Sequence, residues 1–415
     1  MERMNYEDIK TADPEVFKWI QKEVEREEET INLIASENFA SLPVLSAQGS
    51  VLTNKYAEGY SFARYYGGCQ FIDQVEKIAI ERTKELFNCE YANVQPHSGS
   101  QANMSVYFST LKVGDAFLAM DLRAGGHLTH GSSVNFSGKF FKPYFYGVDK
   151  KTETIDFNIV EDLAKKHKPK LIVCGYTAYP RKVDFKTFSE IASRTEAYLL
   201  ADIAHIAGLV VAGLHPSPHP FTDFTTTTTH KTLRGPRGGI VMCKNKFAKQ
   251  VDSTVFPGIQ GGPLMHVIAA KAIALHLAST NEFKKYQEKV IANAKVLADS
   301  LKKLGYRLVS DGTDTHLVLV DLRPQGITGK DTVEILKKAN ICINKNTIPF
   351  DPLSAKLTSG IRLGTPSVTT QGMGEKEIEL IVSFIHSALT NRNDDKKLEQ
   401  IREEVKALCK KFPPY

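Results

Sequence analysis

The strongest constraint on the fold is a series of short apolar segments that alternate with helical segments. The apolar segments are residues 171–174, 198–201, 225–229 and 239–243. Helical spacing of apolar residues occupies 159–167 and 185–195 between them. Short strands that alternate with helices are typical of a mostly parallel sheet covered on both faces. The sequence therefore predicts an α/β fold with helices on both faces of a central sheet.

The regions on either side of this alternation predict an arm and a second, smaller unit. Asp13-Pro14 is typical of a helix start, and the helix is expected over residues 15–29. Further segments are a loop at 54–68, a helix at 72–87, a strand at 91–95 and helices at 101–111 and 281–304. After these come strands at 307–310, 316–322, 341–344 and 361–363, and helices at 329–339 and 375–390. The predicted domains are an N-terminal helical arm (1–30), a large domain (31–280) and a small C-terminal α/β domain (281–415).

Composition excludes several classes of protein. Of the 415 residues, 42% are apolar and 24% are charged, which is ordinary for a globular chain and not for a disordered one. The net charge of +6 is weak, and the lysine clusters lie on mixed helical faces, so we expect no nucleic-acid partner. The sequence contains no apolar run long enough to span a bilayer, and we expect no secretory leader. Its six cysteines have no metal-binding spacing, so we expect a cytoplasmic protein without a metal site.

A turn of Ser98-Gly99-Ser100 joins the expected strand at 91–95 to the helix that follows it. Backbone N–H groups at a helix start favour an anion, and a glycine lets the anion approach closely. This corner predicts either a phosphate site or a turn that only caps a helix.

Asp202 and Lys231 both follow apolar strands. Polar groups at the carboxyl ends of parallel strands are often ligand groups, and Asp202 could pair with a protonated ring nitrogen or cap the next turn. Lys231 lies between His230 and Thr232, where its amine could act as a Schiff-base nucleophile or could face solvent.

Four further patterns have both functional and structural interpretations. The glycine-rich segment at residues 258–263 could bind an anion or form a plain turn. Arg362 could clamp a carboxylate or lie on an exposed strand. The Tyr-rich loop around Glu58 could contain an acid/base carboxylate or anchor an interface. His127 and His130 could stack on a flat ring or bind metal, and their spacing disfavours metal. The order of phosphate corner, stacking histidine, aspartate, lysine and arginine predicts a pyridoxal phosphate enzyme that acts on an amino acid.

Four blocks of the sequence are distinctive, namely LIASENF at 33–39, QPHSGSQAN at 95–103, THKTLRGPRGG ending at Gly239, and FPGIQGGP at 256–263. Together they resemble the serine hydroxymethyltransferase family, whose members are fold-type I pyridoxal phosphate enzymes. The resemblance extends over about residues 10 to 390. It implies a homodimer with shared active sites that converts serine and tetrahydrofolate to glycine and methylenetetrahydrofolate.

The resemblance also implies a role for each matching residue. Lys231 would hold pyridoxal phosphate as an aldimine, Asp202 would pair with its ring nitrogen, and His127 would stack on the ring. Other cofactor contacts would come from His205 and Thr177 near the phenolic oxygen, from Ser98, Gly99 and Ser100 at the phosphate, and from Gly261 and Gly262 of the partner subunit. The substrate carboxylate would contact Arg362 and Ser36 of the same chain. It would also contact Tyr66, which would come from the partner subunit. Tyr56 and Glu58 would also come from the partner, with Glu58 as the proton shuttle. Folate would lie against Glu58, Tyr65, Leu122, Gly126, His127, Leu128 and Asn346.

Several positions depart from the family pattern. Ser61-Phe62-Ala63 replaces Pro-Gly-Lys, Ala124 replaces His, Thr177 replaces Ser, and Ala355-Lys356 replaces Pro-Phe after Ser354. Some of these positions line or support the expected folate site, whereas the cofactor and carboxylate residues are intact. The sequence therefore leaves one alternative, a folate-independent aldolase or transaldolase that acts on threonine or another β-hydroxy amino acid.

Overall fold

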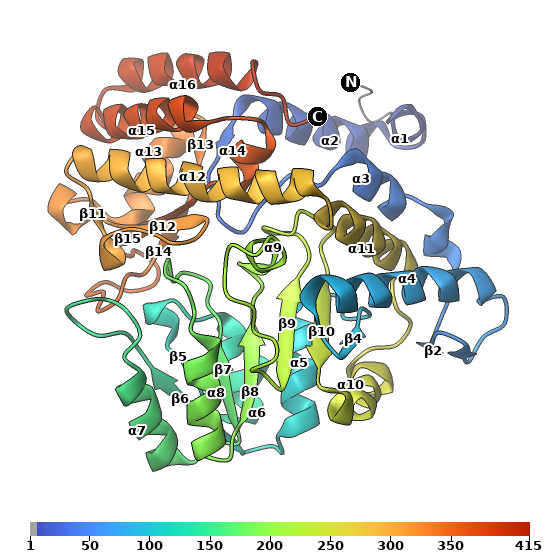
Figure 1. Cartoon of the computed structure of the whole chain (residues 1–415). Helices are drawn as coiled ribbons and strands as arrows, with labels where there is room; N and C mark the ends of the chain where they lie inside the picture. The colour runs from blue at the N-terminus through green and yellow to red at the C-terminus, as the bar shows by residue number, and fades with distance from the viewer. Residues whose placement is uncertain (1–5) are drawn as a thin grey trace. The chain divides into compact units, whose positions relative to one another are not determined.

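The computed structural model describes residues 6–415 and divides into two compact units (Figure 1). The sheet unit is Pro43–Glu288, and the terminal unit joins the described residues up to Leu42 with Lys289–Tyr415. The division into three domains remains a prediction. The compact units group residues 31–42 with the C-terminal part of the chain, whereas the prediction placed them in the large domain.

A seven-stranded sheet forms the centre of the sheet unit. Its order is β4-β10-β9-β8-β7-β5-β6, and only β10 runs antiparallel to its neighbours. The strands are β4 (Tyr91–Asn93), β5 (Ala116–Met120), β6 (Lys142–Tyr146), β7 (Leu171–Cys174), β8 (Tyr198–Asp202), β9 (Phe224–Thr228) and β10 (Gly239–Cys243). The predicted α/β fold with a mostly parallel central sheet is confirmed.

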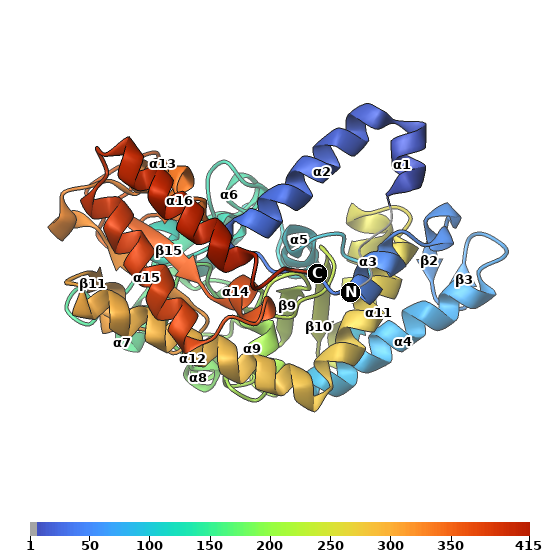
Figure 2. The same ribbon diagram turned by 90° about the horizontal axis from the view of Figure 1, so that it is seen from above.

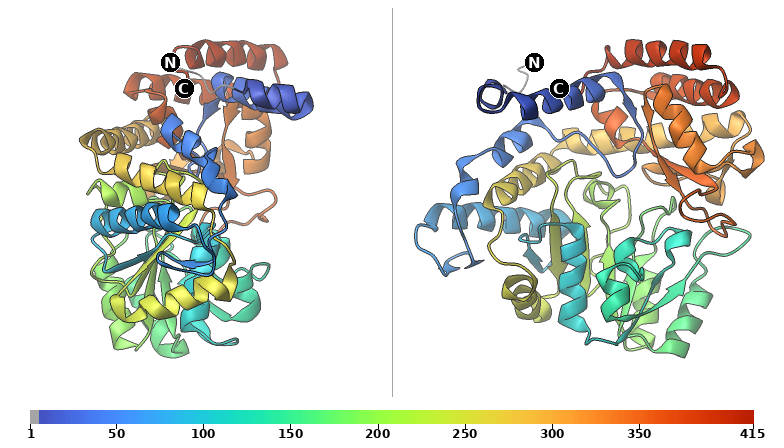
Figure 3. Two further views of the ribbon diagram at one scale, coloured as in Figure 1. Left: turned by 90° about the vertical axis from the view of Figure 1, so that its right-hand side faces the viewer. Right: turned by 180° about the vertical axis from the view of Figure 1, so that it is seen from behind.

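Helices cover both faces of this sheet. One apolar cluster includes side chains of α4 (Gln70–Phe87), α7 (Phe157–His167), α8 (Phe185–Arg194) and α11 (Met265–Ala278). The other includes side chains of α5 (Gly99–Thr110) and α10 (Ala248–Ser253), with α6 (Phe136–Phe140) packed against it. In the right-hand view of Figure 3, α5 is the cyan helix in front of the sheet. The short elements of this unit are α3 (Leu42–Gln48), α9 (Ala207–Val211), β2 (Gly59–Tyr60) and β3 (Ala63–Arg64).

The threonine run of β9 shows why this sequence forms a central strand. Every residue of β9 is buried, and β-branched side chains fit a pleated surface. The buried hydroxyls need partners. Thr225 hydrogen-bonds Thr222 at 2.9 Å, and Thr226 donates to Asn103 at 2.6 Å. The run therefore packs like valine while its hydroxyls bind neighbouring polar groups.

The terminal unit contains a four-stranded antiparallel sheet in the order β11-β12-β15-β14 and a parallel pair β1-β13. The strands are β1 (Ile31–Asn32), β11 (Arg307–Leu308), β12 (Leu317–Asp321), β13 (Ile341–Cys342), β14 (Asn344–Asn346) and β15 (Gly360–Gly364). The helices are α1 (Glu7–Ala12), α2 (Pro14–Glu29), α13 (Gly329–Lys338), α14 (Pro366–Thr370), α15 (Glu375–Thr390) and α16 (Asp395–Cys409), and α12 (Asn281–Lys303) crosses the unit boundary. Figure 2 shows α15 and α16 side by side. Asp13 caps α2, as predicted.

Some predicted elements differ from the structure. The expected strand at 341–344 is two short strands in different sheets, because β13 pairs with β1 and β14 pairs with β15. The expected strand at 307–310 ends at Leu308, where a 3-10 turn with Ser310 at φ 54° begins. The expected loop at 54–68 contains the β2-β3 hairpin. The elements β5, β6, α11 and α16 were not predicted.

Candidate active site

Asp202 and Lys231 lie at the same edge of the central sheet. Asp202 is the last residue of β8, and Lys231 follows β9, which ends at Thr228. The two strands are parallel neighbours, with Asp202 opposite Thr226. Both side chains are buried. In open α/β sheets, ligands bind outside the carboxyl ends of the strands, so this edge is the candidate site.

The Asp202 carboxylate is held by three donors. Its Oδ2 accepts hydrogen bonds from Asn103 Nδ2 at 2.8 Å and His130 Nε2 at 3.1 Å, and its Oδ1 accepts one from the Ala204 N–H at 3.1 Å. Burial alone would raise the pKa of Asp202, but the hydrogen bond and charge of His130 outweigh it and hold the pKa well below its usual value. Asp202 is therefore a buried, ionised group that also caps the following turn.

Asn103 and Thr129 orient this carboxylate, and neither role was predicted from the sequence. The Thr226 hydroxyl donates to Asn103 Oδ1 at 2.6 Å, and Asn103 Nδ2 also donates to Thr129 Oγ1 at 2.8 Å. These contacts fix the amide so that its N–H₂ group faces Asp202. A usable signal was the position of Asn103 in the block that follows the Ser98 corner. His130 was expected to stack on a flat ring or bind metal, and its hydrogen bond to Asp202 was not predicted.

The loop that carries Lys231 is tied to the segment after β8. The Thr232 hydroxyl donates to the His205 carbonyl at 2.9 Å and accepts from the Gly208 N–H at 3.0 Å. His205 is buried and follows Asp202 by three residues in the sequence. Burial, together with the charges of Lys231 and Arg237, lowers the pKa of His230 to about 3, so this imidazole is neutral. The structure thus brings together the segments that carry Lys231, His205 and Asp202.

The Ser98 corner begins α5 at the same edge. Ser98 Oγ accepts a hydrogen bond from the Gln101 N–H at 3.2 Å, so the capping role is real. A Cβ at Gly99 would lie 2.6 Å from Thr228 Cγ2, which leaves room only for glycine between the helix and β9. Ser100 is exposed. The first N–H groups of a helix favour an anion, so the corner also suits a phosphate.

His127 and Thr177 lie in loops that follow β5 and β7. His127 Nδ1 contacts Thr129 Oγ1 at 2.8 Å, which links it through Thr129 to Asn103 and the Asp202 group. The Thr177 N–H donates to the Gly125 carbonyl at 2.8 Å and joins the two loops. Gly126 is needed for close packing, because a Cβ there would lie 2.2 Å from the Met120 carbonyl oxygen.

Glu58 is contacted by two tyrosines of its own loop. The hydroxyls of Tyr56 and Tyr66 donate to Glu58 Oε1 and Oε2, each at 3.3 Å. The negative charge of Glu58 raises the pKa of Tyr66, so this hydroxyl keeps its proton. A Cβ at Gly261 would lie 3.3 Å from Glu58 Oε1, and a Cβ at Gly262 would lie 3.3 Å from Tyr56 Cζ. The tyrosine loop and the Gly261-Gly262 turn therefore lie against each other within one chain.

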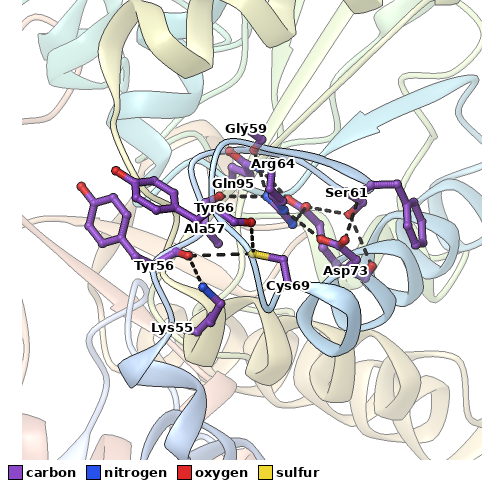
Figure 4. A network of polar contacts seen from close by, with 12 residues as sticks. Lys55, Tyr56, Ala57, Gly59, Ser61, Arg64, Tyr66, Cys69, Asp73 and Gln95 are labelled. Atoms are coloured by element: carbon purple, nitrogen blue, oxygen red, sulfur yellow. Dashed lines mark hydrogen bonds and ion pairs between the residues drawn. The ribbon is translucent and has the colours of Figure 1, made fainter.

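Arg64 holds this loop in place through a network of polar contacts, which Figure 4 shows. Its guanidinium donates to Asp73 Oδ1 at 2.9 Å, to Glu76, and to the carbonyls of Ala57 and Gly59 at 3.0 and 2.8 Å. Gln95 joins the network by donating to the Gly59 carbonyl and to Glu76. Ala57 and Gly59 are the residues on either side of Glu58. The Arg64 network therefore fixes the backbone before and after Glu58.

Two departures from the family pattern take part in the Arg64 network. The Ser61 hydroxyl donates to Glu76 at 2.8 Å, and the Phe62 N–H donates to Asp73 at 3.1 Å. Phe62 has φ 65°, which is the left-handed conformation that suits the family's glycine. The changed residues thus keep the hairpin tied to α4.

In the terminal unit, Arg362 and Ser36 contact each other. Arg362 lies in β15 and is buried, with Nη2 3.3 Å from Ser36 Oγ and Nε donating to Asn344 Oδ1 at 3.1 Å. Burial lowers the pKa of Arg362 to about 10, so it stays positive at neutral pH. Asn346 pairs with Gly360 on the same sheet. A buried arginine in a polar setting suits a carboxylate, which disfavours the interpretation of an exposed arginine.

The other predicted folate residues lie on the surface of the sheet unit. Tyr65, Leu122 and Leu128 are exposed, and the Tyr65 ring lies 5.7 Å from the ring of Phe256. Leu122 and Leu128 belong to the loop that carries Gly126 and His127. The structure thus places Leu122, Gly126, His127 and Leu128 in one loop, and Tyr65 in another.

Residues 6–415 lack two kinds of feature. No cluster of three or more His, Cys, Asp or Glu side chains there could hold a metal ion. No helix in this part of the chain is long and apolar enough to cross a membrane.

The mostly parallel sheet, with a buried lysine and an ionised aspartate at the ends of neighbouring strands, defines a fold-type I pyridoxal phosphate enzyme. The comparison with known families gives the particular family. The family model described as serine hydroxymethyltransferase matches residues 9–385. The chain therefore belongs to the serine hydroxymethyltransferase family, whose enzymes transfer a hydroxymethyl group between serine and glycine and use pyridoxal phosphate and tetrahydrofolate.

Proposed function

We propose that this chain converts serine and tetrahydrofolate reversibly to glycine and 5,10-methylenetetrahydrofolate, with pyridoxal phosphate bound at Lys231. The observation that carries the proposal is the Asp202 carboxylate. Among the described residues, Oδ1 accepts one hydrogen bond, whereas a carboxylate oxygen can accept two. A buried, ionised oxygen with acceptor capacity, on the strand next to Lys231, suits a protonated ring nitrogen.

The chemistry of the edge fits the cofactor. Lys231 offers an amine, the start of α5 offers N–H groups for a phosphate, and Asp202 offers a negative charge. In addition, two buried ring nitrogens, His97 Nε2 and His230 Nδ1, have no hydrogen-bond partner among the described residues. They belong to the residues next to Ser98 and Lys231, where a polar ligand would lie.

Each chain residue then has a defined task. Pyridoxal phosphate, when bound, supplies an electron sink for the charge that develops on the amino acid's Cα. Asp202, oriented by Asn103 and His130, keeps a proton on the ring nitrogen. His127 packs on the ring. Contacts to the cofactor's oxygens come from Ser98, Gly99, Ser100, Thr177 and His205, and from Gly261 and Gly262 of the partner subunit.

Glu58 handles the proton of the serine hydroxyl. Its two oxygens each accept a tyrosine hydroxyl in this structure, from Tyr56 and Tyr66. These donors orient the carboxylate but hold it weakly at 3.3 Å, so it can exchange them for a substrate hydroxyl. Tyr56, Glu58 and Tyr66 serve the active site of the partner subunit.

Arg362 and Ser36 bind the substrate carboxylate. Arg362 is positive, buried, and already oriented by Asn344. A guanidinium can form two parallel hydrogen bonds to a carboxylate, which fixes an amino acid in one orientation.

The folate contacts proposed are Glu58, Tyr65, Leu122, Gly126, His127, Leu128 and Asn346. The Ser61 and Phe62 contacts support this proposal, because they maintain the hairpin that precedes Tyr65. We therefore favour the folate-dependent reaction.

The test is glycine formation from serine by purified, cofactor-loaded protein, with and without tetrahydrofolate. The proposal predicts a large stimulation by tetrahydrofolate. Cleavage of threonine with no stimulation by folate would contradict it.

We also propose that the enzyme is a cytoplasmic homodimer whose two active sites are shared. The proximity of Glu58 and Gly261 in one chain supports this, because both would serve the same partner site. Activity measured beside sedimentation should fall as the dimer dissociates. Full activity at a dilution where only monomer sediments would refute the shared sites.

A further inference from the structure

The apolar helix α11 contains one buried lysine. Lys271 is 1% exposed, and its neighbours Ile268, Ala272 and Leu275 belong to the apolar core. Burying an ammonium group is costly unless hydrogen bonds replace its water. The position therefore calls for a specific set of partners.

Three main-chain carbonyls supply these partners. Lys271 Nζ donates to the carbonyls of Val94 at 2.7 Å, Pro96 at 3.0 Å and Gly239 at 2.8 Å. An ammonium has three N–H donors, so all of them are used. Val94 and Pro96 follow the end of β4, and Gly239 begins β10. Lys271 thus joins two strands where their own ladder has ended.

The carbonyls lie directly beside the Ser98 corner. The Gly239 N–H donates to the Pro96 carbonyl at 3.0 Å, and a Cβ at Gly239 would lie 2.3 Å from the Ser98 carbonyl oxygen. A Cβ at Gly238 would lie 2.4 Å from Lys271 Cε. The lysine, the two glycines and the chain that enters α5 are therefore packed as one unit.

The charge of Lys271 also acts at this corner. Burial lowers the pKa of Lys271 to about 7, with the charge of Glu76 opposing the shift. Burial lowers the pKa of His97 too, and the positive charge of Lys271 adds to that effect. His97 immediately precedes Ser98, so the start of α5 lies within the field of the buried ammonium.

We propose that Lys271 is a positioning residue for the anion site at the start of α5. Its three hydrogen bonds hold the N–H groups of this helix start where a phosphate monoester can accept them. The inference rests on the proposed function, since pyridoxal phosphate is the phosphate monoester concerned.

The test compares affinities for pyridoxal phosphate and for pyridoxal, which lacks the phosphate. Lys271→Met should lower the affinity for pyridoxal phosphate relative to that for pyridoxal on the order of tenfold. A tenfold change corresponds to about 1.4 kcal/mol of binding free energy. The matched control is Ile268→Ala, which removes buried volume from the same helix but touches no carbonyl. It should lower Tm and leave the ratio unchanged. An unchanged ratio in Lys271→Met, or an equal fall in both variants, would overturn the proposal.

A second variant covers the case in which Lys271→Met does not fold. Gly238→Ala places a Cβ against Lys271 Cε and displaces the ammonium without removing it. It should also lower the ratio, and an unchanged ratio overturns the proposal. Cofactor binding by the wild-type protein distinguishes failure of the proposed function from failure of the role proposed for Lys271. Failure of the wild type to bind pyridoxal phosphate refutes the proposed function, whereas normal binding with unchanged ratios in the variants refutes only the role of Lys271.

Discussion

The sheet unit stabilises its buried carboxylates in two ways, one at the Asp73 and Glu76 pair and the other at Asp202. Arg64 donates to both Asp73 and Glu76, so a permanently charged guanidinium pairs with both carboxylates. Asp202 instead accepts hydrogen bonds from a histidine, an amide and a main-chain N–H. The charges of the Arg64 network are balanced within the chain, so this network stabilises a loop. In the proposed function, Asp202 pairs with the ring nitrogen of the cofactor.

Removing Arg64 tests this difference with the largest expected effect. Arg64→Met leaves two buried carboxylates unpaired, and we expect the free energy of unfolding to fall by about 3–5 kcal/mol. Denaturant unfolding of the cofactor-loaded protein measures it. The control is Arg26→Met, because Arg26 pairs with Glu23 on an exposed helix and should cost below about 1 kcal/mol. Equal losses in the two variants would remove the distinction.

Asp202→Asn should impair turnover and leave stability largely unchanged, unlike Arg64→Met. We expect turnover to fall on the order of 10²–10³, because the negative charge opposite the cofactor is lost, while the fold persists. The control is Asp223→Asn. Asp223 lies at the amino end of β9 and pairs with Lys244 on the far edge of the sheet, so turnover should change little. If Asp202→Asn keeps wild-type turnover, Asp202 is structural.

Glu58→Gln tests whether the loop that Arg64 holds is itself catalytic. Glutamine keeps the shape of the side chain but cannot take up a proton, so folate-dependent serine cleavage should fall on the order of 10². Cofactor binding should be unchanged in an absorbance titration. An unaltered rate would remove Glu58 from the mechanism.

The pH dependence of stability gives the smallest effect. The folded pKa of Asp202 lies below the ordinary value of 3.8, so its ionised form adds stability above about pH 4. That stability is lost as the pH falls through the folded pKa, at up to about 1.4 kcal/mol per pH unit. The stability difference between wild type and Asp202→Asn should therefore shrink below about pH 4. A difference that stays constant in acid unfolding curves would show that the carboxylate is not ionised when folded.

Local patterns in the sequence were enough to predict strands β7, β8, β9 and β10 and the polar residues that follow β8 and β9. Asp202 and Lys231 follow buried strands directly, so the parallel sheet alone brings them to one edge. Asn103 and Lys271 could not be found this way, because each acts on atoms distant in the chain. Lys271, for example, contacts Val94, 177 residues away.

The short strands were harder to predict from the sequence, because they also depend on contacts that are distant in the chain. The segment from Ile341 to Asn346 contains two strands with different partners, and one partner, β1, lies far earlier in the chain. The β2-β3 hairpin has strands of two residues each and depends on Arg64 for its position. Neither arrangement follows from local apolar spacing.

The most direct test of the central claim is to find which lysine binds the cofactor. Borohydride reduction of the cofactor-loaded protein, followed by digestion and mass spectrometry, locates the bound pyridoxyl group. The predicted result is a single modified peptide that contains Lys231, absent in Lys231→Ala. Modification of a different lysine, or of none, would contradict the site described at the edge of β8 and β9.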